Sequence, residues 1–293
     1  MKKALASFSF KLLAAAVAMS PLVTQAAPEE ITYLLPAPPN SPAFAPWMIA
    51  QQKGYYADEN LKVNFIAGKG GVDVAKQIGA GNAVVGGAIG DTPVIVRPNG
   101  VPVKAVAVLG AGSLTLLAAS KDSGIKSPAD LKGKTVTVMA YTDTTYYALL
   151  GTLRKFKLNK NDLSIQAAGP AGVWQLFAAG KSQAMAGVAE WFVEADQAAP
   201  GKIELLPPEE NFKSMAQAIL VSDETIKKNP DLVKRLVRAT LRGMQDIMKD
   251  PHEAAITYAQ AVPSYKGKEA SLERMLSLYN KYTYANQKVL GQI

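Results

Sequence analysis

One stretch with the pattern of strand, glycine turn and capped helix constrains this fold most. Ala83–Ile89 is an apolar run of small residues, which is typical of a buried parallel strand. Gly90 permits a sharp turn, and Asp91 or Thr92 can then cap a helix that begins at or near Pro93. Such a strand end leaves backbone N–H groups free, and in open α/β sheets ligands bind at this edge.

Turns of this kind are common in α/β proteins, so a single such turn is equally consistent with a plain connection that binds no ligand. Here the pattern recurs at Tyr141–Thr145 and around Glu190, each time after an apolar, strand-like run. The recurrence favours a shared ligand site over unrelated turns.

Strand-like runs alternate with helical patterns up to residue 222, which is typical of βα units around parallel sheets. From Asp223 onward the pattern is helical. Two apolar runs, Leu114–Ala119 and Met215–Val221, look like paired crossovers between two sets of βα units. We therefore predict two α/β lobes joined by two hinge segments, with the chain returning to the first lobe. The predicted boundaries are 27–115 and 216–293 for the first lobe and 116–215 for the second.

The first 26 residues have the pattern of a cleavable signal peptide. Lys2 and Lys3 form a basic start, an apolar stretch centred on Leu12–Val17 follows, and small residues precede a cut near Ala26. A membrane anchor is the alternative, but Lys11 leaves no uninterrupted apolar run of about 20 residues. We expect a soluble protein exported to the periplasm.

Composition restricts the chemistry. The chain has no cysteine, which excludes disulfides, cysteine nucleophiles and thiolate metal sites. Its only histidine, His252, is far in sequence from every candidate site residue, so a Ser-His-Asp triad would have to use it. We therefore expect neither a cofactor, nor a metal centre, nor catalysis.

The net charge is +8, and loss of Lys2, Lys3 and Lys11 with the signal peptide would leave +5. The remaining basic residues are spread over predicted helix faces rather than gathered in one patch. This distribution and the exported location argue against a nucleic-acid partner.

Four local patterns together resemble one family. They are Gly54-Tyr55-Tyr56 before a strand at Leu61, the Gly90-Asp91 turn, the segment 99–103, and the segment 121–134. They are similar to the periplasmic solute-binding proteins of ABC importers for sulfonates, taurine, nitrate and thiamine-pyrimidine precursors. The resemblance covers about residues 31–263.

The resemblance implies a two-lobed periplasmic-binding-protein fold of type II, whose lobes close about hinges on a small solute. It also implies an inner-membrane ABC permease as partner, and we expect a monomer. The ligand contacts that it implies in the first lobe are Asn40, Ser41, Phe44, Gly71, Asp91 and Thr92. In the second lobe they are Tyr141, Thr144, Thr145, Tyr146, Glu190 and Trp191.

The chemistry of these positions leaves the ligand open. Pooled helix N-termini suit an anionic group, such as a sulfonate. Asp91, Asp143 and Glu190 instead suggest a ligand with N–H donors or a cationic nitrogen, either a zwitterion or a nitrogen heterocycle. The alternative is that each acid only caps its own helix.

Aromatic side chains at the candidate site carry a similar ambiguity. Phe44, Tyr141 and Trp191 can stack on a flat ring or hold a cation, or they can simply pack at a lobe edge. We predict the solute-binding component of an ABC import system. Two alternatives are a ligand-sensing protein for a signalling partner and, less favoured, a periplasmic enzyme.

Overall fold

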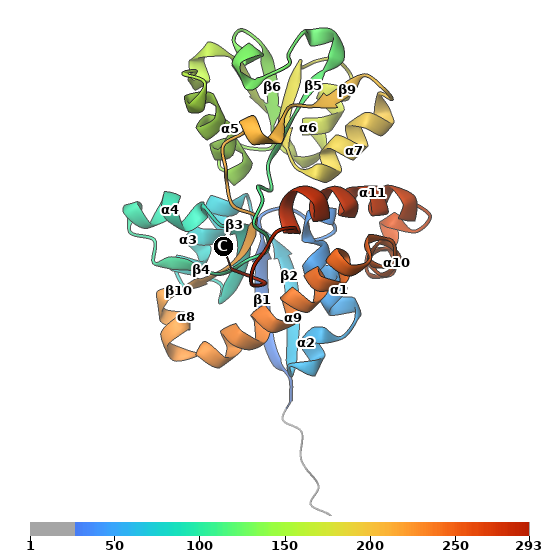
Figure 1. The fold of residues 1–293 in the computed structure, drawn as a ribbon. Helices are drawn as coiled ribbons and strands as arrows, with labels where there is room; N and C mark the ends of the chain where they lie inside the picture. The colour runs from blue at the N-terminus through green and yellow to red at the C-terminus, as the bar shows by residue number, and fades with distance from the viewer. Residues whose placement is uncertain (1–26, 293) are drawn as a thin grey trace, which may run out of the picture.

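The protein is described by a computed structural model over residues 27–292, and the predicted signal peptide lies outside these residues. Two α/β lobes lie one above the other and are linked by two chain segments, 109–115 and 206–216 (Figure 1). Each lobe holds one five-stranded sheet. The fold class predicted from the sequence is confirmed.

The sheet of lobe I has the order β2-β1-β3-β10-β4. Its strands are β1 (Glu29–Leu35), β2 (Leu61–Ala67), β3 (Val85–Ile89), β4 (Val103–Val108) and β10 (Gln217–Ser222). The sheet of lobe II has the order β7-β6-β8-β5-β9. Its strands are β5 (Leu116–Ser120), β6 (Thr135–Val138), β7 (Ser164–Ala167), β8 (Ala184–Gly187) and β9 (Ile203–Leu205).

Helices cover both faces of each sheet. Lobe I carries α1 (Ala45–Gln52), α2 (Tyr55–Asp58), α3 (Gly71–Gly79), α4 (Thr92–Val96), α8 (Asp223–Lys228), α9 (Pro230–Lys249), α10 (Pro251–Ala261) and α11 (Glu269–Tyr279). Lobe II carries α5 (Thr144–Lys155), α6 (Gly169–Ala178) and α7 (Ala189–Ala198). Short helical turns lie at Pro42–Phe44, Arg97–Asn99, Lys121–Ser123, Pro128–Leu131, Lys160–Asp162, Pro208–Glu210 and Pro263–Tyr265, and a π-helical turn lies at Asn280–Tyr284.

The two apolar runs that the sequence suggested as crossovers are strands of the sheets. β5 is the first strand of lobe II and runs antiparallel between β8 and β9, and β10 is the first strand after the return and runs antiparallel between β3 and β4. Both runs are apolar because both are buried inside a sheet. The crossing segments therefore lie just before these strands.

The C-terminal helices build the outer wall of lobe I. α9 begins at Pro230, where the Asn229 side chain accepts a hydrogen bond from Leu232 N. Gly243 lets α9 pack closely on α1, because a Cβ there would lie 2.1 Å from Pro46 O. None of the described helices has the length and apolar character needed to cross a membrane.

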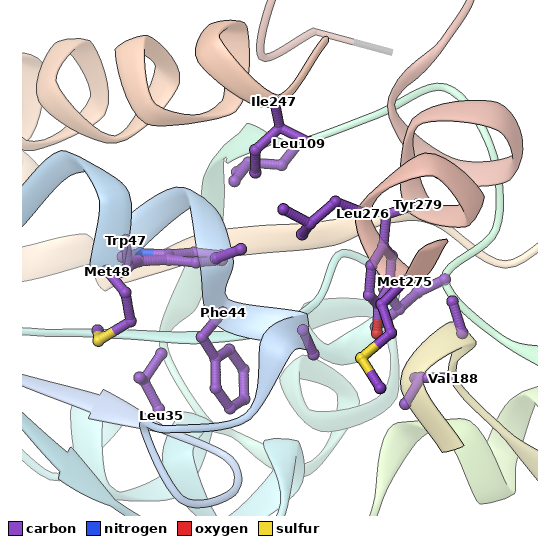
Figure 2. Packing of buried hydrophobic residues seen from close by; sticks show 14 of the residues in the cluster. Leu35, Phe44, Trp47, Met48, Leu109, Val188, Ile247, Met275, Leu276 and Tyr279 are labelled. Carbon is purple, nitrogen blue, oxygen red and sulfur yellow. The ribbon is translucent and has the colours of Figure 1, made fainter. Parts of the chain in front are cut away.

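The largest apolar core is continuous across the lobe boundary. It contains lobe I residues such as Trp47 of α1 and Met275 and Leu276 of α11, together with Val188 and Trp191 of lobe II. Figure 2 shows part of this cluster, with Val188 in the same view as the α11 side chains. The lobes thus share buried apolar surface, which favours the contact seen here.

Candidate functional site

A cavity lies between the lobes. Its empty volume is about 500 Å³ including its open mouth. The lining residues are Pro36, Ala37, Ser41, Ala43, Phe44, Trp47, Gly87, Ala88, Ile89, Leu114, Met139, Asp143, Thr144, Thr145, Val188, Glu190, Trp191 and Gln217.

The carboxyl ends of three parallel strands bring these residues together. The chain leaves β3 at Ile89, leaves β6 just before Met139, and leaves β8 just before Val188. α5 and α7 begin within six residues of β6 and β8, so their first turns face the cavity. This is the edge at which the sequence predicted ligand binding.

Glu190 is the most extensively bonded side chain of the cavity. It belongs to α7 of lobe II, is 2% exposed, and accepts hydrogen bonds from three groups of lobe I. Ser41 Oγ donates to its Oε1 over 2.5 Å and Ala43 N over 3.3 Å, and the Tyr279 hydroxyl donates to Oε2. Burial raises the pKa of Glu190 to about 7, although the hydrogen bonds from Ser41 and Ala43 N oppose that shift.

Asp143 is the second carboxyl at the cavity, and it caps its own helix. Its Oδ1 accepts from Thr145 N over 2.9 Å and from the Thr145 hydroxyl, so it fixes the first turn of α5. Burial raises the pKa of Asp143, and the bonds from Thr145 oppose the shift. Capping was one of the two alternatives left open by the sequence.

One buried polar atom of the lining, Oε1 of Gln217, has no hydrogen-bond partner among residues 27–292. The Nε1–H of Trp47, another lining residue, is directed at the Tyr33 hydroxyl. Sequence reasoning missed both residues. Gln217 carried a signal, since it is a polar residue inside the apolar run 215–221 and is next to a crossing segment. Trp47 carried none, because an apolar residue near a helix start reads as ordinary core.

Six predicted site residues line the cavity and six do not. Those that line it are Ser41, Phe44, Thr144, Thr145, Glu190 and Trp191. Asn40 lies outside the lining, and its main-chain oxygen accepts a hydrogen bond from the Tyr258 hydroxyl over 2.9 Å. Gly71 is not a lining residue but packs against two of them, since a Cβ there would lie 3.0 Å from the Ala88 methyl and 3.2 Å from the Thr144 side chain of lobe II.

The remaining predicted residues lie outside the cavity lining. The Asp91 carboxylate accepts from Met215 N over 2.9 Å and makes no cap bond to α4, and Thr92 is fully buried beside it. Tyr141, 52% exposed, and Tyr146 line a separate hollow with Lys160. Two carboxyls rather than three therefore face the cavity.

Interlobe contacts also lie outside the cavity. Arg274 of α11 pairs with Asp196 of α7 at 2.6 Å, and Gln197 donates to Ser271 Oγ over 2.9 Å. Thr142 Oγ1, which follows β6, donates to Lys69 O, which follows β2, over 3.2 Å. We call the contacts between α7 and α11 the α7–α11 seam. Within residues 27–292, no group of three His, Asp or Glu side chains is arranged to hold a metal ion.

Known proteins resemble this chain in sequence. The family described as NMT1/THI5 like matches residues 41–254. A curated relative, the riboflavin-binding protein RibY of Chloroflexus aurantiacus, is 28% identical over 253 residues, which cover 85% of this chain and 71% of the relative.

Two solved structures share the fold. A Bordetella bronchiseptica RB50 protein superimposes with a TM-score of 0.74 at 21% identity, covering 90% of this chain and 84% of that one. The alkanesulfonate-binding protein SsuA of Xanthomonas axonopodis pv. citri, bound to MOPS, gives a TM-score of 0.69 at 21% identity, with coverage of 86% and 85%. At these identities the likeness establishes architecture only.

Proposed function

This chain belongs to the NMT1/THI5-like family, and from that premise we propose that it is the periplasmic solute-binding component of an ABC import system. The support is a two-lobed fold with a cavity between the lobes and relatives named as binding proteins. The partner would be an inner-membrane permease that recognises the closed protein. The predicted signal peptide, 1–26, fits export.

We propose further that the solute is a planar nitrogen heterocycle without net negative charge. The observation that carries this choice is the charge of the lining, which contains Glu190 and Asp143 but no lysine, arginine or histidine. An anion buried here would have no cationic partner and would meet two carboxyls. The aromatic residues Phe44, Trp47 and Trp191 offer faces and edges to a flat ring.

Riboflavin is the first compound to test, because the relative RibY is named as a riboflavin-binding protein. Its tricyclic ring is planar, uncharged and rich in nitrogen. The cavity has an empty volume of about 500 Å³ including its mouth. The lobes would separate to admit the ring and close on it. The hinge segments 109–115 and 206–216 would absorb that movement.

We propose capture without chemical conversion. His252 lies on α10, is exposed and pairs with Glu273 at 2.8 Å, so it is not a lining residue of the cavity. Glu190 and Asp143 are held by protein donors, and this gives both carboxyls a structural task. An enzyme would instead turn over the bound solute.

The test is a binding panel on the protein without its first 26 residues. Riboflavin, lumichrome, taurine and MOPS are titrated while tryptophan fluorescence is followed, and thermal unfolding is measured with each compound. We expect the two ring compounds to quench fluorescence and to stabilise the fold by about 2.7 kcal/mol at 100 times Kd. Binding of taurine or MOPS without binding of either ring would overturn the proposed ligand class.

A further inference from the structure

The cavity holds an amide side chain that the fold leaves unused. Gln217 is 3% exposed, and its Oε1 has no partner among residues 27–292. Its main chain, in contrast, belongs to the sheet, because Gln217 O accepts from Leu109 N over 2.7 Å and the residue lies opposite Ile89 of β3. These main-chain interactions would form with almost any residue at position 217, so they do not account for the glutamine side chain.

Two other polar side chains of the lining are already committed to protein partners. Ser41 donates to Glu190, and the Thr145 hydroxyl donates to Asp143. Apolar side chains such as Ile89, Leu114 and Met139 make up much of the remaining lining. A buried polar atom without a partner is costly, and native proteins satisfy nearly all of them. Such an atom at a cavity wall is therefore available to a ligand.

The chemistry of the Gln217 amide defines the ligand edge that it can meet. A primary amide offers an acceptor and a donor side by side. Trp47 lines the same cavity, but its Nε1–H is directed at the Tyr33 hydroxyl and is not free for a ligand.

We propose that Gln217 is the specificity-determining residue of the cavity and selects rings that carry an N–H next to a carbonyl. The Gln217 amide forms two parallel hydrogen bonds with this lactam edge. The inference rests on the proposed function and narrows its ligand class from nitrogen heterocycles to lactam or imide rings. Uncharged groups on both sides fit a lining without cationic side chains.

Discrimination between ligands should be strong, because a ligand that lacks the N–H or the carbonyl leaves a hydrogen-bonding group of the Gln217 amide unsatisfied. A site built around a hydrogen bond rejects an analogue that lacks the bonding group far better than an apolar pocket does. An N-methylated imide is such an analogue, since it keeps both carbonyls and the ring but loses the donor.

The experiment compares riboflavin with 3-methylriboflavin on the wild-type protein and on Gln217→Met. We expect wild type to bind riboflavin on the order of 10- to 100-fold more tightly than the methylated compound. In Gln217→Met the ratio should fall to about one, mainly through weaker binding of riboflavin. A ratio that is unchanged in Gln217→Met would overturn the inference.

A second readout does not need a ligand. Gln183→Met is the matched control, because Gln183 Oε1 accepts from Thr135 N over 2.8 Å and is used by the fold. We expect Gln183→Met to lower the melting temperature of the ligand-free protein, and Gln217→Met to leave it unchanged or raise it. Equal losses in the two variants would overturn the inference. If the wild-type protein binds neither flavin, the proposed ligand class fails. The melting temperatures of Gln217→Met and Gln183→Met then decide by themselves whether the Gln217 side chain is reserved for a ligand.

Discussion

Ser41 Oγ in lobe I lies 2.5 Å from Glu190 Oε1 in lobe II, and this hydrogen bond joins the lobes at the wall of the cavity. The Tyr279 hydroxyl of lobe I donates to the other oxygen of the same carboxyl. A residue predicted from sequence as a ligand contact is thus bonded chiefly to the opposite lobe. We infer that Glu190 works as a latch that holds the lobes together.

Removing the latch should open the protein. Glu190→Ala leaves the donors of Ser41, Ala43 and Tyr279 without an acceptor, at a cost of about 1–3 kcal/mol for each group that stays buried. We expect a larger radius of gyration by small-angle scattering and at least about tenfold weaker riboflavin binding. Glu190→Gln keeps an acceptor for Ser41 and is the control. Equal compactness of Glu190→Ala and wild type would contradict the latch.

The latch should also respond to pH. Burial raises the pKa of Glu190 from an ordinary 4.5 to about 7, so the closed protein binds a proton that an exposed glutamate would release. The stabilisation is fully present below pH 4.5 and is lost as pH rises through 7, over a span of about 3 kcal/mol. Ionisable neighbours that face this carboxyl are Glu194, Tyr258, Tyr265, Tyr279 and Tyr284.

The measurement is riboflavin affinity between pH 5 and pH 8.5. We expect affinity to fall with rising pH in wild type, because binding is coupled to closure, and to change little in Glu190→Gln, which has no proton to lose. A pH profile shared by the two proteins would assign the effect to another group.

The α7–α11 seam should tune affinity from outside the cavity. Arg274 and Asp196 are part-exposed and 2.6 Å apart, so their pair contributes up to about 1 kcal/mol. We expect Arg274→Met to weaken riboflavin binding by up to about fivefold, mainly through faster release. The effect should shrink in high salt. A double-mutant cycle with Asp196→Asn measures the coupling, and additive single effects would show that the pair is not coupled.

The first linking segment, residues 109–115, depends on a close approach at Gly112. A Cβ there would lie 1.9 Å from Tyr282 O, and Gly112 N donates to Thr283 O over 3.0 Å. Gly112→Ala should therefore push the C-terminal segment off the linking segment and destabilise the protein by about 1–3 kcal/mol in chemical denaturation. Gly172→Ala on α6 is the milder control, since its new Cβ meets only the Ala168 methyl at 3.0 Å. Similar losses in both variants would contradict the steric argument.

Short-range features were largely readable from the sequence. The segment starting at Ser127 forms the capping box expected of Ser-Pro-Ala-Asp, and Asp143 caps α5. Local reading failed where partners are distant. Asp91 or Thr92 was expected to cap α4, but the Asp91 carboxylate instead accepts a hydrogen bond from Met215 N, 124 residues away in the chain. The two apolar runs read as crossovers because a buried strand and a buried linker have the same composition.

By itself the sequence determined the alternation of strands and helices, the family resemblance, and the strand ends at which a ligand site forms, because periodicity and caps are encoded within a few consecutive residues. Only the tertiary structure decided which side chains meet there. Ser41 and Glu190 are 149 residues apart in the chain, and Gln217 faces the cavity only because β10 lies antiparallel beside β3. Such partnerships depend on how whole lobes pack, and no local pattern encodes that.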